Sequence, residues 1–187
     1  MAGEKTLDIG IGAGGTYITQ DARHKILRIG LDLNPISLEI ARQKYALPLV
    51  NADAAVNKTI HLPFKNKSFS KVEIILPHDE LLIALTDQNS DFWQEIKRIT
   101  KKEVSIILDT DYFGRQGVST NGKSIVLDHP DKLIADNLRA NGFSVSEFRE
   151  MTSQEVKLLG TQFTKSTASW MQEMVRQKVY KIVASIK

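Results

Sequence analysis

Runs of apolar residues alternate with longer stretches of mixed polarity along the chain, and this alternation predicts strands followed by helices. Short apolar runs that end in glycines or turn residues predict seven strands, at residues 5–9, 26–32, 47–51, 71–76, 104–108, 143–148 and 175–186. Helical patterns fill most of the remaining segments, at residues 16–24, 36–45, 79–100, 130–141 and 152–173. Strands separated by helices predict an α/β fold with a doubly wound, mostly parallel sheet.

The segment at residues 36–45 carries the clearest helix signals. Asn34 is placed to cap the first turn, and Pro35 occupies the first helical position, where its missing N–H costs nothing. Helical spacing brings Ile36, Ile40 and Tyr45 near one face.

Other boundaries follow from turn residues. The helical stretch at 79–100 is expected to break near residues 87–90, and Asn141-Gly142 ends the helix at 130–141. Residues 110–128 contain several glycines, and we expect them to form a long connection of the kind that is often functional.

Composition narrows the class of protein. The 187 residues suit one domain over residues 1–187, and 42% hydrophobic with 25% charged residues is ordinary for a globular chain. The absence of cysteine excludes disulfides, thiolate nucleophiles and cysteine-bound zinc, and we expect no metal site. No apolar run approaches the roughly 20 residues of a membrane helix, and no signal peptide opens the chain. We therefore expect a cytoplasmic monomer without a membrane partner.

The formal net charge of +3 is distributed unevenly. Residues 151–187 carry six basic and two acidic side chains, whereas residues 1–150 are close to neutral. The basic segment is either a solvated face or a surface for an anionic partner such as nucleic acid.

A glycine-rich loop after the first expected strand is the strongest chemical feature. Gly10, Gly12 and Gly14 allow a sharp turn against which a ligand can lie, and Gly15 completes a dinucleotide-type pattern with Gly10 and Gly12. Asp8 would repel a pyrophosphate at this place, but it suits S-adenosylmethionine, which carries an ammonium and a sulfonium. The alternative is a plain glycine turn with a solvated Asp8.

Two further carboxylates follow the next two strands. Asp32 lies 24 residues after Asp8, where it can accept both ribose hydroxyls of an adenosyl group; alternatively, it is an acid near a helix start. Asp53, with Ala54 beside it, can accept a hydrogen bond from the adenine amino group, or it is an ordinary turn residue.

The sequence resembles the class I S-adenosylmethionine-dependent methyltransferases in the order and spacing of three motifs. These are the D-x-G-x-G-x-G loop, the G-x-D that ends the strand expected at residues 26–32, and the D-A pair. The resemblance covers residues 5–109, and the last two strands resemble that fold's closing hairpin. It implies a Rossmann-like, seven-stranded sheet with an antiparallel last strand, and acceptor-side insertions near residues 110–128 and 151–173. Asn34 and Leu76 are then further cofactor-binding residues, beside Asp8, the glycines, Asp32, Asp53 and Ala54.

Residues 74–82 are similar to a segment of the 16S rRNA adenine-N1 methyltransferases of the aminoglycoside-resistance family. The resemblance implies that Pro77 and His78 border the acceptor and that rRNA or the small ribosomal subunit is the partner. The family stacks its target adenine between two tryptophans, and these positions are His78 and Thr167 here, with Trp170 three residues further on. Trp170 is thus a candidate acceptor-stacking residue or a core residue, whereas Trp93 suits the core.

The sequence leaves three functions open. The first is methylation of a base nitrogen of structured rRNA, with adenine N1 of small-subunit rRNA preferred. The second is a small-molecule N- or O-methyltransferase in which His78 is the general base. The third is a cofactor-binding protein without catalysis. His78 is, on the other hand, also placed to be a simple helix cap.

Overall fold

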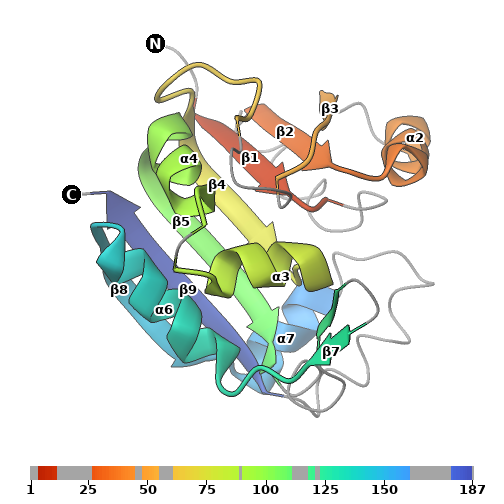
Figure 1. The fold of residues 1–187 in the computed structure, drawn as a ribbon. Coiled ribbons are helices and arrows are strands. Elements are labelled where there is room, and N and C mark those ends of the chain that lie inside the picture. The colour runs from red at the N-terminus through yellow and green to blue at the C-terminus, as the bar shows by residue number, and fades with distance from the viewer. Residues whose placement is uncertain are drawn as a thin grey trace.

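The structure is a computed structural model and describes residues 4–11, 27–44, 48–54, 61–88, 90–110, 118–120, 123–160 and 178–186. Within these ranges, the chain forms a seven-stranded sheet, a small hairpin and five helices. Figure 1 shows their arrangement. The sheet strands are β1 (Lys5–Ile9), β2 (Leu27–Asp32), β3 (Leu49–Asn51), β4 (Phe69–Ile75), β5 (Thr100–Asp109), β8 (Phe143–Glu150) and β9 (Val179–Ile186). The helices are α2 (Pro35–Lys44), α3 (Asp79–Thr86), α4 (Phe92–Ile99), α6 (Pro130–Ala140) and α7 (Ser153–Gly160).

The sheet confirms the expected fold class. Its strand order is β3-β2-β1-β4-β5-β9-β8. Strands β3, β2, β1, β4 and β5 are parallel, and β9 runs antiparallel to both of its neighbours. The carboxyl ends of the five parallel strands therefore meet at one edge, and the start of β9 lies at the same edge.

The two faces of β5 show how the layers pack. Ile106 and Leu108 belong to the main core, which the sheet shares with α3, α4 and α6. Ile107, between them, belongs to a smaller cluster with Val156 and Leu159 of α7. The long apolar run of β5 is thus explained by helices on both faces.

Trp93 of α4 is a core residue, as the sequence indicated. Its side chain is fully buried, and Nε1 donates a hydrogen bond to the Leu85 carbonyl oxygen at 3.3 Å. Phe143 approaches the indole edge-on, with ring centroids 6.1 Å apart. A tryptophan that is buried in this way is not available to stack on an acceptor base.

Two local expectations are corrected. The long connection expected at residues 110–128 contains a hairpin of β6 (Val118–Thr120) and β7 (Lys123–Ile125), and β6 lies against α3. In α2, Leu38 and Ala41 face the protein, whereas Ile36 and Ile40 are 71% and 38% exposed. The structure therefore turns the face with Ile36 and Ile40 towards solvent.

Most of the remaining elements agree with the sequence to within a few residues. Of the helix expected at residues 152–173, the structure describes α7 up to residue 160, and residues 161–173 lie outside the described residues. The break between α3 and α4 falls at the expected place, and β5 starts earlier than expected, at Thr100. The helix expected at residues 16–24 lies outside the described residues. Among the helices that the structure describes, none is long and apolar enough to cross a membrane. The single-domain organisation stays a prediction.

Candidate functional site

Gly10 forms a sharp turn where β1 ends. Its φ is +75°, and its N–H donates to the Leu31 carbonyl oxygen at 2.8 Å, which ties the turn to β2. A Cβ at this position would approach Leu81 Cδ2 to 3.3 Å. The backbone conformation therefore favours glycine, and a Cβ would in addition require Leu81 to shift by a few tenths of an ångström. Gly12 and Gly14 lie outside the described residues.

Asp32 ends β2 at the same edge and is 7% exposed. Its Oδ1 accepts the Asn34 N–H at 2.8 Å, which fixes the carboxylate beside the start of α2. Asn34 in turn caps the helix, as expected, because its Oδ1 accepts the Ile36 N–H at 2.9 Å. Asn51 Nδ2 donates to the Asp32 carbonyl oxygen at 3.1 Å and holds the end of β3 against β2.

One pocket brings together five residues that the sequence assigned separately. Gly10, Asp32, Asp53, Ala54 and His78 all line it, and they come from the ends of β1, β2 and β3 and from the start of α3. Asp8, Asn34, Leu76 and Pro77 are not among the described residues that line this pocket. Trp170 lies outside the described residues.

The segment between β4 and α3 has a constrained backbone. Leu76 has a φ of +50°, which is uncommon for a residue with a Cβ, and its N–H donates to the Ile107 carbonyl oxygen at 2.8 Å. Pro77 is buried and precedes His78, the N-cap of α3. Strained residues of this kind cluster at functional sites, where the surrounding structure maintains them.

His78 caps α3 with its side chain. Its Nδ1 accepts the Leu81 N–H at 3.4 Å, a long and therefore weak hydrogen bond, and the imidazole is otherwise exposed. A neutral imidazole that accepts at Nδ1 carries its proton on Nε2, an assignment based on this hydrogen bond. In the capping arrangement, His78 therefore presents a hydrogen-bond donor and a flat ring to the pocket.

Asp8 lies in a buried ionic network that the sequence analysis missed. Arg28 Nη1 contacts Asp8 Oδ1 at 2.6 Å and Glu73 Oε2 at 2.7 Å, and Lys71 Nζ contacts Glu73 Oε1 at 2.7 Å. Burial opposes ionisation of Arg28, but Asp8 and then Glu73 outweigh it and raise the pKa of the guanidinium. Burial likewise favours neutral Glu73, yet Lys71 and then Arg28 hold its pKa below the ordinary value.

The network places the Asp8 carboxylate in the sheet, against a cation of the neighbouring strand. The sequence carried a signal for it, because Asp8, Arg28 and Glu73 are charged residues flanked by apolar residues within three expected strands. The pairing register of β1 with β2 and β4 was needed to show that these charges meet. Contact of Asp8 with a cofactor stays a prediction.

A doubly wound sheet with a glycine turn at the end of β1 and a carboxylate at the end of β2 defines an α/β protein that binds a nucleoside-type ligand. Residues 7–108, which are more than half of the chain, match the methyltransferase domain family. The chain therefore belongs to the methyltransferase domain family. Enzymes of this class take S-adenosylmethionine as cofactor. The roles of Gly10 and Asp32 towards this cofactor stay predictions.

One curated relative is a phthiotriol/phenolphthiotriol dimycocerosates methyltransferase of Mycobacterium leprae (strain TN). It is 35% identical over 77 residues, which cover 38% of this chain and 26% of the relative. The match thus spans about a quarter of that protein's length.

Solved structures share the fold over nearly the whole chain. The 16S rRNA methyltransferase KamB is 18% identical with a TM-score of 0.69, and the match covers 98% of this chain and 88% of KamB. Geranyl diphosphate C-methyltransferase from Streptomyces coelicolor A3(2) is 13% identical with a TM-score of 0.66, covering 100% of this chain and 74% of that one. The [4+2]-cyclase SpnF is 17% identical with a TM-score of 0.58, covering 98% of this chain and 75% of SpnF. At these identities the likeness concerns the fold, and the fold alone does not specify the reaction.

Proposed function

We propose that this chain transfers the methyl group of S-adenosylmethionine to a base nitrogen of structured rRNA, with adenine N1 of the small-subunit rRNA as the acceptor. The observation that carries the proposal is the single pocket lined by Gly10, Asp32, Asp53 and His78. It joins the residues assigned to the cofactor with a residue assigned to the acceptor, at the edge where ligands of doubly wound sheets bind.

In this proposal the cofactor is held by the ends of three neighbouring strands. The Gly10 turn, continued by Gly12 and Gly14, lies against the amino-acid part, with Asp8 and Leu76 nearby. Asp32, positioned by the Asn34 N–H, accepts the ribose hydroxyls, and Asp53 with Ala54 faces the adenine. When bound, S-adenosylmethionine supplies an electrophilic methyl carbon on a sulfonium.

His78 favours an acceptor that already has a lone pair. While Nδ1 accepts the Leu81 N–H, the neutral ring has its proton on Nε2. Its one acceptor nitrogen is therefore occupied, and the ring can take a proton from a substrate only after this hydrogen bond is broken. Adenine N1 needs alignment with the methyl carbon rather than a strong base. His78 therefore orients or stacks on the base, Pro77 fixes the segment before it, and Trp170 is proposed as the second stacking residue.

The basic C-terminal segment supports an RNA partner. Residues 151–187 supply six of the basic side chains, and among the described ones Lys178 directly precedes the strand β9 at the carboxyl edge. Contacts of lysine and arginine with phosphates would give an affinity that falls with salt. Similarity of fold to a 16S rRNA methyltransferase is consistent with this choice of acceptor.

Radioactive transfer assays test the proposal. The full chain is incubated with tritiated S-adenosylmethionine and, separately, with small ribosomal subunits, naked rRNA, tRNA and a metabolite extract. We expect label in the rRNA of the subunits and a reverse-transcription stop at the modified base. Asp32→Ala should abolish the label, whereas Asp136→Asn, at an exposed carboxylate of α6, should retain it. Label in the extract alone would contradict an RNA acceptor.

A small-molecule acceptor is the second candidate, favoured by the identity with the dimycocerosates methyltransferase of Mycobacterium leprae (strain TN). It requires His78 to act as the base and therefore to leave the cap. Transfer of labelled methyl groups to a component of the metabolite extract should then be lost in the variant His78→Asn. Asparagine can cap α3 but cannot act as a general base. Label in rRNA that survives His78→Asn supports the RNA acceptor instead.

A further inference from the structure

Asn51, the last residue of β3, connects the ends of β2 and β3 through its side chain. Its Nδ2 donates to the Leu33 carbonyl oxygen at 2.8 Å and to the Asp32 carbonyl oxygen at 3.1 Å. The residue pairing of the two strands ends at Asp32 and Asn51, so Leu33 lies beyond it. The Asn51 amide thus continues the connection between the strands past the end of their pairing.

The peptide group between Leu33 and Asn34 links this contact to the Asp32 carboxylate. Its carbonyl oxygen accepts the hydrogen bond from Asn51 Nδ2, and its N–H donates to Asp32 Oδ1 at 2.8 Å. A peptide group is planar, so a contact that fixes its carbonyl also fixes the direction of its N–H. Asn51 therefore constrains the direction of the Asp32 carboxylate through the backbone.

Asn51 itself is outside the pocket lined by Gly10 and Asp32. Asp32 and Leu33 from the end of β2, and Asp53 from the segment after β3, line this pocket, whereas Asn51 is not among its described lining residues. The two strand ends that Asn51 holds together carry the carboxylates assigned to the ribose and to the adenine. An effect of Asn51 on a ligand of this pocket would thus pass through the residues that it holds.

We propose that Asn51 is a positioning residue for the adenosyl part of S-adenosylmethionine, because it fixes the Leu33–Asn34 peptide group and thereby aims the Asp32 carboxylate at the ribose hydroxyls. The inference rests on the proposed role of Asp32 in ribose binding. Hydrogen bonds weaken steeply when they are misaligned, and one carboxylate that accepts two neighbouring hydroxyls needs a defined direction. Loss of the Asn51 amide leaves the carboxylate in the pocket but weakens its bonds to the ribose.

A double-mutant cycle on the full chain tests this role, with the affinity for S-adenosylhomocysteine measured by calorimetry. Asn51→Leu keeps a branched side chain of similar size and removes both donors. Asp32→Ala keeps the backbone carbonyls that Asn51 holds and removes only the carboxylate. We expect Asn51→Leu to weaken binding about tenfold in the unmodified chain and by less than about twofold in the Asp32→Ala chain, where the group it positions is gone.

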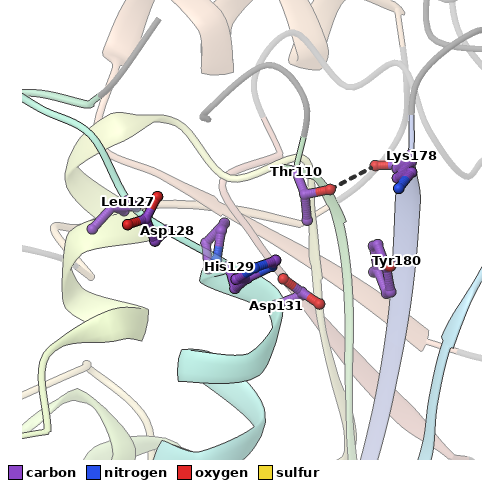
Figure 2. A pocket seen from close by; sticks show the side chains of 8 residues that line it. Thr110, Leu127, Asp128, His129, Asp131, Lys178 and Tyr180 are labelled. Carbon is purple, nitrogen blue, oxygen red and sulfur yellow. Dashed lines mark hydrogen bonds between the residues drawn. The ribbon is translucent and has the colours of Figure 1, made fainter. Parts of the chain in front are cut away.

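Thr110→Val is the matched control, because it removes a similar contact at another pair of strand ends. Thr110 Oγ1 donates to the Lys178 carbonyl oxygen at 3.1 Å, where the end of β5 meets the start of β9, and Figure 2 shows this contact as a dashed line. Thr110 and Lys178 line a separate pocket that shares no described lining residue with the pocket of Gly10 and Asp32. Thr110→Val should leave the affinity for S-adenosylhomocysteine unchanged.

Three results would overturn the inference. The first is an equal loss of affinity from Asn51→Leu with and without the Asp32 carboxylate, which would mean that Asn51 only supports the edge of the sheet. The second is an unchanged affinity in a folded Asn51→Leu protein, and the third is an equal loss in Thr110→Val. If Asn51→Leu failed to fold, the same cycle with Asn51→Ser decides, because a single hydroxyl cannot donate to both carbonyl oxygens.

The outcomes also separate this inference from the proposed function. Transfer of label to rRNA, together with equal effects of Asn51→Leu in both chains, refutes the role of Asn51 alone. An effect of Asn51→Leu that depends on Asp32, with label found only in a metabolite extract, supports the role of Asn51 and refutes the rRNA acceptor. Full affinity in Asp32→Ala refutes the ribose assignment and the inference with it.

Discussion

The buried network around Arg28 gives a quantitative prediction. The guanidinium and its partner carboxylates are each no more than 10% exposed, and Nη1 contacts Asp8 at 2.6 Å and Glu73 at 2.7 Å. Arg28→Met retains most of the apolar stem and removes the charge. The variant therefore leaves two carboxylates in the sheet without the cation that lies between them.

The expected loss of stability follows from the geometry. Removing one partner of a buried ion pair costs about 3–5 kcal/mol, because the remaining charge stays buried. Lys71 still contacts Glu73, at 2.7 Å, so the lower end of this range applies. We expect Arg28→Met to lower the free energy of unfolding by about 3 kcal/mol at pH 7.

The effect should depend on pH in a defined direction. Burial favours the neutral form of Glu73, but Lys71 and Arg28 hold its pKa below the ordinary value of 4.5. A carboxyl with a lowered folded pKa stabilises the fold above its unfolded pKa, and this contribution is lost as the pH falls. The difference between the unmodified chain and Arg28→Met should therefore be largest near pH 7 and narrow below about pH 4.5.

Urea unfolding with linear extrapolation, at pH 7 and at pH 4, measures both effects. Arg139→Met is the control, because it removes an exposed ion pair with Asp136, whose loss should cost at most about 1 kcal/mol. If Arg28→Met were no less stable than Arg139→Met at pH 7, the network would not stabilise the fold as argued. A difference that did not change with pH would refute the assignment of charge to the carboxylates.

Three further predictions concern substitutions of Asp32, Gly30 and Glu155. Asp32→Ala should weaken S-adenosylhomocysteine binding, measured by calorimetry, by about 100-fold or more, because the two hydrogen bonds from the ribose hydroxyls to the carboxylate are lost. Retained affinity would contradict the ribose assignment. Gly30→Ala places a Cβ 2.5 Å from Ile11 Cδ1. Urea unfolding should therefore show a free energy of unfolding lower by about 1–3 kcal/mol. An unchanged midpoint would mean that the Ile11 side chain moves aside without cost. The hydrogen bond from Arg149 lowers the pKa of Glu155 to about 2. Glu155→Gln should therefore be less stable than the unmodified chain at pH 7, with a difference that shrinks between pH 4.5 and pH 2 and is followed by urea unfolding; a constant difference would exclude the charge.

Local signals in the sequence predicted most of the elements. The Asn34 cap and the Gly142 stop act within a few residues, and the structure has Asn34 accepting the Ile36 N–H and Gly142 at a φ of +80°. The hairpin β6–β7 was missed because its strands are short, although the Asn121-Gly122 dipeptide between them is a typical hairpin turn signal.

Features that depend on strand order could not be predicted in the same way. The apolar spacing of Ile36 and Ile40 was correct for a helix, but only the packed sheet decides that Leu38 faces inwards instead. Arg28 lies 20 residues from Asp8 and 45 from Glu73, and the sequence alone does not place three strands side by side. That Gly10, Asp32, Asp53 and His78 line one pocket could be expected from the sequence, because each lies at or just after the end of a strand of the parallel set; that this pocket binds the cofactor stays a prediction.

The antiparallel insertion of β9 explains why the pocket lined by Thr110, Lys178 and Tyr180 was not predicted from the sequence. In a parallel sheet, the residues at one edge are those that follow the strands, and Thr110 after β5 obeys this rule. Lys178 and Tyr180 stand at the start of β9, and they reach the same edge only because the strand is reversed: Asp109 of β5 pairs with Val179. A parallel last strand would bring its other end, with Ile186, to this edge instead. The reversal thus brings Lys178 and Tyr180 to a pocket beyond β5, at the same sheet edge as the pocket lined by Gly10 and Asp32.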